Sequence, residues 1–483
     1  MGQRDLRPKL APAMCTARHG TAVPRGQDPG AGIPGGRFGR MFPHLPPCEP
    51  TDAEIDALVA CMRPPHGYVP ADNIEQVPAG YTYFGQFVDH DITFDPLSHL
   101  QRRNDPHALV NFRTPRFDLD SLYGSGPKDQ PFLYDWDCES HPGVKLLVGS
   151  NPCDRRKLAL VDLPRNAQGR ALIGDARNDE NLIVAQLHLL LIKFHNKVVE
   201  RLRTRQSTLG CDELLAEAQR FVRWHYQWLV INDFLKRRVG GPAAARALKH
   251  RRFYAASDEP VIPLEFSAAA YRFGHSMVRG DYLPKSDAPQ RFPIFRKPGD
   301  DRLSFRGFQP LPEALEIQWD LFFPGPKTSE PNRSTRIDPL LVVPLFSLPD
   351  GAELARLNLQ RGRALGLPSG PDVARAMSIA PLTDAQLGAV SDLPATTVAQ
   401  LRASLATLPL WVYILTEAYV DSGGTSLGRV GGQIVAEVLI GLLEADPNSY
   451  VRRQPNWTPE LSDGPDEFDM GDIVRYVQDP TRL

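Results

Sequence analysis

The stretch ENLIVAQLHLLLIKFHNKVVERLR, residues 180–203, carries the strongest periodic pattern in this chain of 483 residues. Its apolar side chains recur every three or four positions, the spacing of one face of an α-helix; they are Ile183, Leu187, Leu190, Leu191, Phe194 and Val198. A second helical pattern covers 212–239 and stops at Gly240-Gly241, a sequence suited to a helix C-terminus. The chain therefore has at least two long helices.

Other helical patterns lie at 265–278, 350–360, 383–390, 396–420 and 427–444, whereas alternating strand patterns are scarce. We expect a mainly α-helical fold: one large helical domain with long irregular loops and few short strands. The domain is predicted to span 51–458, with a capping box at Thr51 and Glu54 opening its first helix. The first 50 residues are rich in Pro and Gly, which predicts an irregular arm over 1–50. For residues 459–483 we expect an acidic tail, packed on the domain or loosely attached.

Composition excludes several classes of protein. The net charge is −2 without a polybasic run, so nucleic acid is not an expected partner. The apolar fraction of 42% is typical of a globular chain. We see no uninterrupted apolar run of about 18 residues, so we expect no membrane span. Residues 1–20 lack the apolar stretch of a Sec signal peptide, which predicts a cytoplasmic or non-classically exported protein. The sequence does not settle the oligomeric state.

The segment Tyr83–Asp95, YFGQFVDHDITFD, crowds polar and charged groups among aromatic ones. If it is helical, Gln86 and His90 are four residues apart and share one face. Asp89 and Asp91 flank His90 and point elsewhere. A surface His–Asp cluster and a buried imidazole steered by its neighbours both remain open from this segment alone.

The segment TPRFDLDSLYG, residues 114–124, concentrates oxygen ligands. Thr114, Asp118 and Asp120 stand at even spacing, so an extended loop would aim their oxygens to one side. Hard oxygen ligands suit calcium, although the loop is not an EF-hand. A merely solvated acidic loop is the alternative.

The segment GDARNDE, residues 174–180, precedes the long helix, where acidic residues favour the helix N-terminus. Arg177 is the unusual member, because an arginine entering an apolar bundle is expected to be paired or aimed at an anion. His188 and His195 lie further along the helix, and we interpret both as structural histidines with satisfied hydrogen bonds.

Two later segments complete the set. YRFGHSM, residues 271–277, places His275 after a glycine, which leaves room for a flat group, although a core histidine is the alternative. LNLQRGR, residues 357–363, places Asn358 and Arg361 at a helix end, where arginines also serve as simple caps.

The order and spacing of these five segments resemble the animal-type haem peroxidases and their bacterial relatives, the peroxidase–cyclooxygenase superfamily. The resemblance runs from about residue 80 to residue 370. It implies haem b as cofactor, with hydrogen peroxide and a small reducing donor as substrates. His90 looks like the distal acid–base histidine, Gln86 its polar neighbour and Arg177 the distal arginine.

The resemblance also assigns the other face of the haem. His275 looks like the proximal iron ligand, and Asn358 looks like the amide that accepts its Nδ1–H. Arg272 and Arg361 look like partners of the haem propionates. Asp89 and Glu180 match two carboxylates that are esterified to haem methyl groups in mammalian members. The implied calcium ligands are Asp91, Thr114, the carbonyl of Arg116, Asp118 and Asp120.

Two departures from the family pattern narrow the function. Ala364-Leu365 replaces an Asp-His pair that often follows the last motif, which puts local packing in doubt. The fatty-acid dioxygenase branch carries a radical-forming tyrosine three residues before the proximal histidine, where this chain has Arg272. We therefore expect peroxidase chemistry with a phenol, halide or pseudohalide donor. The alternatives are fatty-acid oxygenation and a haem- and calcium-stabilised interaction module with little turnover.

Overall fold

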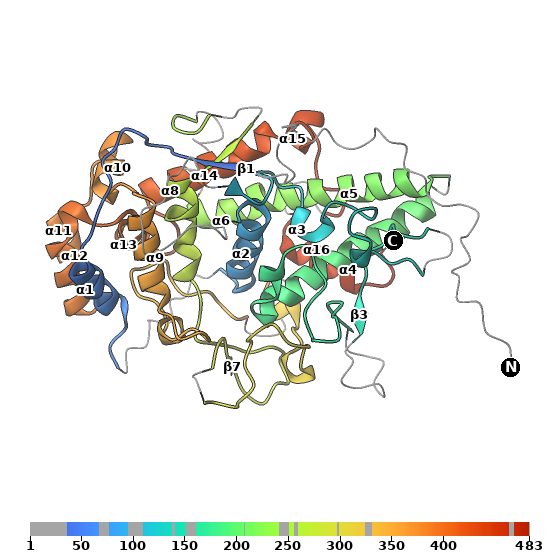
Figure 1. Ribbon diagram of the computed structural model, residues 1–483, viewed down its shortest axis with the longest axis horizontal. Coiled ribbons are helices and arrows are strands. Elements are labelled where there is room, and N and C mark those ends of the chain that lie inside the picture. The colour runs from blue at the N-terminus through green and yellow to red at the C-terminus, as the bar shows by residue number, and fades with distance from the viewer. Residues whose placement is uncertain are drawn as a thin grey trace.

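The fold is dominated by helices, with short strands at its margin (Figure 1). The structure is a computed structural model. It describes residues 36–66, 77–94, 110–137, 141–150, 161–206, 208–240, 251–255, 259–296, 299–323, 331–462 and 468–482. The mainly α-helical fold is as predicted. The part of the expected arm before residue 36 lies outside the described residues.

Two long helices, α4 (Leu182–Arg205) and α5 (Cys211–Trp228), pack side by side at one end of the molecule (Figure 1). Asn181 caps α4, its side chain accepting from the backbone N–H groups of Ile183 and Val184. Helix α5 continues through the π-helix η4 (Leu229–Leu235) into α6 (Lys236–Val239). It ends at Gly240, whose φ of 73° suits glycine.

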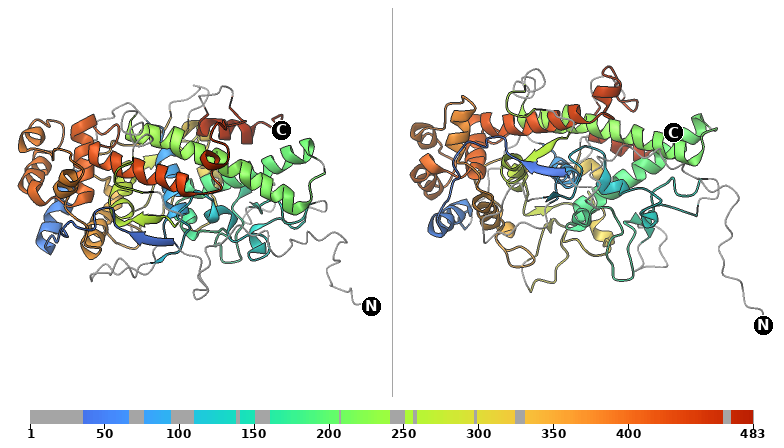
Figure 2. Two further views of the ribbon diagram at one scale, coloured as in Figure 1. Left: turned by 90° about the horizontal axis from the view of Figure 1, so that it is seen from above. Right: turned by 45° about the horizontal axis from the view of Figure 1, so that its top comes forward.

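A second group of helices gathers at the opposite end, drawn in orange with the blue α1 (Figures 1 and 2). It comprises α1 (Asp52–Met62), α9 (Leu354–Ala364), α10 (Gly370–Ala376), α11 (Asp384–Gly388), α12 (Ala395–Ala403) and α13 (Leu410–Ser422). The predicted capping box of α1 is present. Helix α14 (Arg429–Ala445) packs on both α13 and α6 and so joins the two groups.

The strands are few and short, as expected. β1 (Gly36–Gly39) pairs antiparallel with β2 (Val110–Asn111) and parallel with β5 (Val261–Pro263). Two further pairs are β3 (Gly149–Ser150) with β4 (Val161–Asp162), and β6 (Asp281–Tyr282) with β7 (Phe292–Pro293). β1 corrects the prediction of an irregular arm over 1–50, because its backbone gains hydrogen-bond partners on both sides.

Several helix predictions need correction. The pattern at 396–420 is two helices, because Pro409 separates α12 from α13 and has no N–H to continue a helix. The pattern at 265–278 is α8 (Leu264–Ser267) followed by the 3-10 helix η5 (Ala270–His275). The remaining short helices are α3 (Asp120–Tyr123), α15 (Tyr450–Arg453) and the 3-10 turns at 131–133, 176–179, 313–315, 319–321, 343–346 and 405–407.

The C-terminal segment is anchored by α16 (Met470–Gln478), which packs on α4. Helix α4 is long and apolar enough to cross a membrane by length and composition, and 83% of its most apolar window is buried inside the protein. The absence of a membrane span stays a prediction. Cys48 and Cys61 carry free thiols, and Cys211 is disulfide-bonded.

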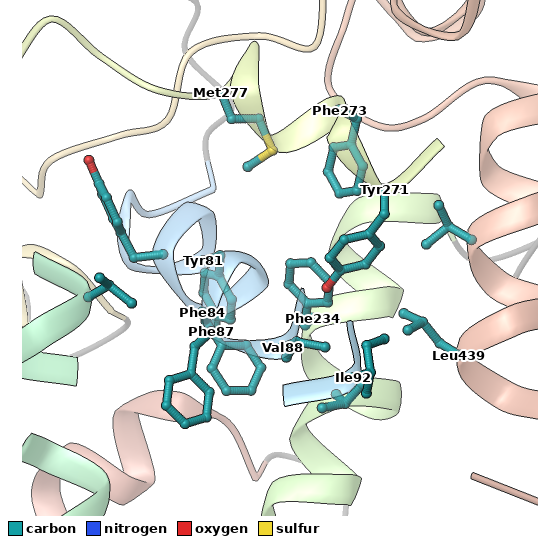
Figure 3. Packing of buried hydrophobic residues seen from close by; sticks show 14 of the residues in the cluster. Tyr81, Phe84, Phe87, Val88, Ile92, Phe234, Tyr271, Phe273, Met277 and Leu439 are labelled. Carbon is teal, nitrogen blue, oxygen red and sulfur yellow. The ribbon is translucent and has the colours of Figure 1, made fainter. Parts of the chain in front are cut away.

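The core lies where helix α2 (Gly80–Ile92) meets η4 and η5. Figure 3 shows Phe84 and Val88 of α2 beside Phe234, with Tyr271 and Phe273 of η5 close by. Phe234 contacts all three aromatic partners, with ring centroids 5.9 to 6.5 Å apart. This packing fixes two elements that carry histidines, because His90 lies on α2 and His275 ends η5.

Candidate functional site

His90 lies near the end of α2 with its side chain buried. Its Nδ1 lies 2.8 Å from Oδ1 of Asn178, which leaves Nε2 as the other reactive nitrogen. Burial and the nearby Arg177 charge lower the pKa of His90 to about 4. The imidazole is therefore neutral at neutral pH. The structure excludes a surface His–Asp cluster.

Asn178 connects His90 to a second histidine. Its Nδ2 lies 3.1 Å from Nδ1 of His188 on α4, and both side chains are buried. His188 is thus a satisfied core histidine, as predicted, but its partner is the residue that contacts His90. His195 is satisfied elsewhere, by the hydroxyl of Tyr123 and the carbonyl of Val144.

Gln86 lies one turn before His90 and contacts Glu180 rather than His90. Gln86 Nε2 donates to Glu180 Oε1, and Asn181 Nδ2 donates to Gln86 Oε1 at 3.1 Å. Burial raises the pKa of Glu180 to about 7. Asp89 accepts from the hydroxyl of Thr93 at 3.0 Å. The amide of Gln86 therefore holds a carboxyl group beside His90.

Arg177 is held against the end of α2. Its Nε and Nη2 both donate to Asp175, and Nη2 also reaches the carbonyls of His90 and Thr93. The guanidinium lies over the ring of Phe94, 4.5 Å from its centroid. Nη1 has no hydrogen-bond partner among the described residues, so it is the end of the group that remains open to a ligand.

His275 is fixed by the second turn of α9. Its Nδ1 lies 2.8 Å from Nδ2 of Asn358, whose Oδ1 accepts from Arg272 Nη1 at 3.0 Å. Burial and the Arg272 charge lower the pKa of His275 to about 3. Trp411 of α13 lies edge-on to the ring, 6.5 Å between centroids. These contacts bring together three segments that are far apart in the sequence.

The orientation of Asn358 corrects one prediction. We expected its oxygen to accept from His275 Nδ1–H, but the oxygen faces Arg272 and the amide nitrogen faces His275. The physical reason is competition, because a guanidinium is a donor only and takes the acceptor end of the amide. Iron at Nε2 would require the proton on Nδ1, and hence a half-turn of the carboxamide.

The two histidines belong to one site. Asp89 and Arg177 lie beside His90, and Arg272 lies beside His275. The charge of Asp89 raises the pKa of Arg272, and the charge of Arg177 lowers it, so the two groups of residues are close in space. Glu180, Arg272 and His275 all have pKa values shifted by burial, yet each retains some accessible surface. A Cβ added at Gly274 would meet no atom within 4 Å, so open space lies beside the backbone next to His275.

The residues around His275 fit a haem. They offer a neutral imidazole for iron. Arg272 and Arg361 lie close enough that the charge of Arg361 lowers the pKa of Arg272, which burial brings to about 10. Two neighbouring cations suit two propionates. The structure thus brings Arg272, Asn358 and His275 together, with Arg361 nearby, as the sequence predicted.

The oxygen-rich loop forms a carboxylate cluster directly behind His90. Oxygens of Asp91, Asp118 and Asp120 all lie within 4.8 Å of one another. Burial and the charges of Asp120 and Asp118 raise the pKa of Asp91 well above its usual range. Burial and the charge of Asp118 raise the pKa of Asp120 to about 7. Thr114 joins the cluster by donating to Asp118 at 2.7 Å. A divalent cation would relieve this repulsion.

The loop is not extended, which corrects the predicted geometry. Leu119 adopts a left-handed φ of 57°, and α3 begins at Asp120. The chain turns here, so the oxygens converge through a turn and not through strand alternation. The role of the Arg116 carbonyl as a ligand stays a prediction.

Three functional residues were not identified from the sequence. Asn178 contacts His90, Asp175 holds Arg177, and Arg113 donates to Asp175 at 2.6 Å and to Asp120 at 3.4 Å. Bonds and charges of Arg177 and Arg113 outweigh burial and hold the pKa of Asp175 well below its usual range. Asp175 and Asn178 are part of GDARNDE, so their place in that motif was an available signal.

Comparisons with known proteins agree with this geometry. Thyroid peroxidase from Sus scrofa is 26% identical over 294 residues, which are 54% of this chain and 30% of the relative. The chain spans less than half the length of these curated relatives.

Two solved structures share the fold. Peroxidase A from Dictyostelium discoideum superposes with a TM-score of 0.65 at 16% identity, covering 90% of this chain and 95% of that one. A fatty acid alpha-dioxygenase from Oryza sativa gives a TM-score of 0.58 at 17% identity, covering 89% and 77%.

The family model described as animal haem peroxidase matches residues 98–458. This range contains His275, Asn358 and the segment with Arg177, and it begins just after His90. With the match covering most of the chain, and with residues suited to hold the cofactor, the chain belongs to the animal haem peroxidase family.

Proposed function

We propose that this chain is a peroxidase that reduces hydrogen peroxide and oxidises a small donor such as a phenol, a halide or a pseudohalide. The observation that carries the proposal is the state of His90. Its imidazole is buried and neutral, its Nδ1 is bonded to Asn178, and its Nε2 remains for chemistry. Haem, when bound at His275, supplies the redox-active iron.

His90 has the protonation state that peroxide reduction needs. Neutral Nε2 accepts a proton from the bound peroxide and returns it to the oxygen that departs, so that water forms. A pKa of about 4 keeps the base free over the physiological range. Protonation in acid would remove the acceptor.

Arg177 complements His90 with a fixed positive charge. It cannot lose its proton, and Asp175 holds it in place through two of its nitrogens. A donor near the peroxide stabilises the negative charge that develops as the O–O bond breaks. Arg113 extends this support, because its Nη2 donates to Oδ2 of the same carboxylate.

The carboxylate cluster is proposed as a calcium site with Asp91, Thr114, Asp118, Asp120 and the carbonyl of Arg116 as ligands. Asp91 follows His90 directly in α2, so a cation bound there would restrain the backbone that carries the acid–base residue. The metal's role is structural, with a consequence for catalysis.

Asp89 and Glu180 are proposed as sites of ester links to haem. Glu180, with a pKa near 7, is partly protonated at neutral pH, and Gln86 fixes its position. After turnover with peroxide, we expect acidified butanone to leave haem on the protein. The variants Asp89→Asn and Glu180→Gln should each lose one link, which mass spectrometry of haem peptides detects. Full extraction from the wild type would contradict the links.

Arg272 argues against fatty-acid oxygenation. It stands where the dioxygenase branch has its tyrosine, and its guanidinium is bonded to Asn358 and to the carbonyl of Ser267. Neighbouring Tyr271 is buried against the ring of Phe266, 4.8 Å between centroids. Neither residue offers an accessible phenol at that position.

The test is steady-state oxidation of guaiacol by the haem-loaded protein with hydrogen peroxide. We expect turnover that falls at least about a hundredfold in His90→Gln, the loss typical of a missing acid–base group. His195→Gln is the matched control, because His195 is buried on α4 but bonded elsewhere. Oxygen uptake with linoleate and no guaiacol oxidation would favour the dioxygenase. Tight haem binding without either reaction would favour the interaction module.

A further inference from the structure

Asn178 lies between two buried imidazoles. Its Oδ1 is 2.8 Å from Nδ1 of His90, and its Nδ2 is 3.1 Å from Nδ1 of His188. The exposed fractions of the three residues are 5% for His90, 0% for Asn178 and 1% for His188. Water therefore does not compete for these two bonds.

The chemistry of the amide couples the protons of the two rings. A carboxamide accepts only at its oxygen and donates only at its nitrogen. The oxygen at His90 requires a proton on His90 Nδ1, so His90 Nε2 keeps its lone pair. The nitrogen at His188 requires a lone pair on His188 Nδ1, so the proton of that ring is on Nε2.

The reverse amide orientation would disable the base. It would place the NH₂ group at His90 Nδ1 and move the ring proton to Nε2, where a donor would replace the acceptor. The partner at the other end of the amide bears on which orientation it adopts. The structure places the amide nitrogen at Nδ1 of His188, which presents a lone pair there in the Nε2–H form. Burial lowers the pKa of His188 to about 3, so the ring is neutral and this form is available to it.

We propose that His188 is a positioning residue for His90. By accepting from Asn178 Nδ2 it fixes the orientation of the amide, which fixes the Nδ1–H form of His90 and leaves Nε2 as the base. The effect of His188 on catalysis rests on the proposed peroxidase function, whereas its effect on the tautomer of His90 does not depend on that function.

Burial keeps both rings neutral. The charge of Asp175 raises the pKa of each ring, and on His90 the charge of Arg177 lowers the pKa while that of Asp89 raises it, but burial has the largest effect on both. On α2, His188 also contacts the ring of Phe87, 5.9 Å between ring centroids. Within the described residues, the hydrogen bonds that connect His188 to His90 pass through Asn178.

The direct test is the tautomer of His90 by ¹⁵N nuclear magnetic resonance of histidine-labelled protein. The protein carries zinc protoporphyrin, which is diamagnetic, in place of haem, and His90→Gln identifies the signal. We expect Nδ1–H in the wild type. In His188→Phe and Asn178→Leu the Nε2–H form should gain about tenfold, the effect of one buried hydrogen bond. In His188→Gln, whose carbonyl can accept from the amide, the wild-type tautomer should return.

Two further variants make the test specific. His195→Phe perturbs the same helix but should leave the tautomer unchanged, because His195 bonds Tyr123 and Val144. Asn178→Asp accepts from both rings, so His90 should keep Nδ1–H while its pKa rises. The acid limb of the reaction between haem-loaded protein and peroxide should then move to higher pH by about one unit or more.

The outcomes separate this inference from the proposed function. An unchanged tautomer in folded His188→Phe, together with a wild-type pH profile, would overturn the positioning role while peroxide turnover stands. A tautomer that depends on His188 in a protein that does not react with peroxide would support the positioning role and contradict the peroxidase function.

Discussion

Asn358 is the residue on which the His275 side of the site depends. It contacts His275 and Arg272 at once, and one amide cannot present its oxygen to both. Ligation of iron by Nε2 of His275 needs an acceptor at Nδ1, which also makes the ring a stronger donor. We infer that Arg272 must give up the amide oxygen when it turns to a propionate.

We predict that Asn358→Leu weakens haem binding about 10–100-fold, as removal of a ligand's hydrogen-bond partner usually does. Asn358→Asp should bind haem at least as well as the wild type, because a carboxylate accepts from both neighbours without turning. The rate of haem transfer to excess apomyoglobin measures both effects. Equal release rates for Asn358→Leu and the wild type would mean that His275 does not need this amide.

At the scale of single residues, the sequence predicted identities better than orientations. His90, Arg177, His275 and Asn358 were assigned from motifs, and the structure brings each to the expected neighbourhood. The orientation of the Asn358 amide depends on which donor reaches its oxygen. That competition is settled in three dimensions by a guanidinium from another segment, which no local pattern encodes.

Among the elements, the loop before α3 has the clearest dependence on pH. Burial and neighbouring carboxylates raise the pKa of Asp120 to about 7. Calcium requires the ionised carboxylates, so a proton competes with the metal below that pH. We predict that calcium binds about tenfold more weakly at pH 6 than at pH 8, measured by titration calorimetry.

Without calcium, the protein should become less stable as the pH rises, whereas calcium binding favours the ionised carboxylates at higher pH. A carboxyl whose pKa is raised in the folded state stabilises it at low pH and loses that contribution as the pH rises through the folded value. In a chelator, the free energy of unfolding should therefore fall between about pH 4 and pH 7. Asp120→Asn should reduce both effects. Calcium affinity that is equal at pH 6 and pH 8 would contradict this account of the cluster.

The helices show where periodicity is informative and where it is not. The range predicted as 180–203 is observed as Leu182–Arg205, because a continuous apolar stripe and a capping asparagine define it locally. The break at Pro409 could be predicted from the chemistry of proline, although the apolar pattern runs across it. The turn at Leu119 could not be predicted, since a leucine with a left-handed backbone conformation is held by its surroundings.

For the whole molecule, the C-terminal helix is a structural clamp on α4. Tyr476 is 1% exposed, and its ring meets Phe194 edge-on at 5.8 Å. Lys197 lies over the same ring, 4.9 Å from its centroid, and donates to the carbonyls of Tyr476 and Asp479. This segment is therefore packed on the domain, one of the two arrangements that the sequence left open.

We predict that Tyr476→Ala lowers the free energy of unfolding by about 3–5 kcal/mol, the usual cost of removing a buried aromatic ring. Tyr476→Phe keeps the ring and should change stability little. Urea unfolding measures both. Phe194 is six residues from His188 along α4, about 9 Å, so the folded Tyr476→Ala variant should react with peroxide as the wild type does. A loss of reactivity without a loss of stability would contradict the clamp.

The assembly of the whole site was the feature that the sequence pattern predicted least well. Periodicity predicts helices, but it does not predict that α2, η5 and α9 come together at one site. The resemblance to the peroxidase–cyclooxygenase superfamily supplied that arrangement, and the contacts of Phe234 with Phe84, Tyr271 and Phe273 give its physical basis. Charge balance across the site also depends on Arg113, which joins Asp175 to Asp120 across 55 positions of the sequence.

The measurement that tests the central claim most directly is the rate at which peroxide changes the Soret band of the haem-loaded protein, followed by stopped flow. Wild type and His90→Gln are compared from pH 3 to pH 8. The account predicts a fast wild-type reaction that declines in acid around a pKa of about 4, and a variant at least about a hundredfold slower and without that decline. Equal rates for the two proteins across this range would show that His90 is not the acid–base residue.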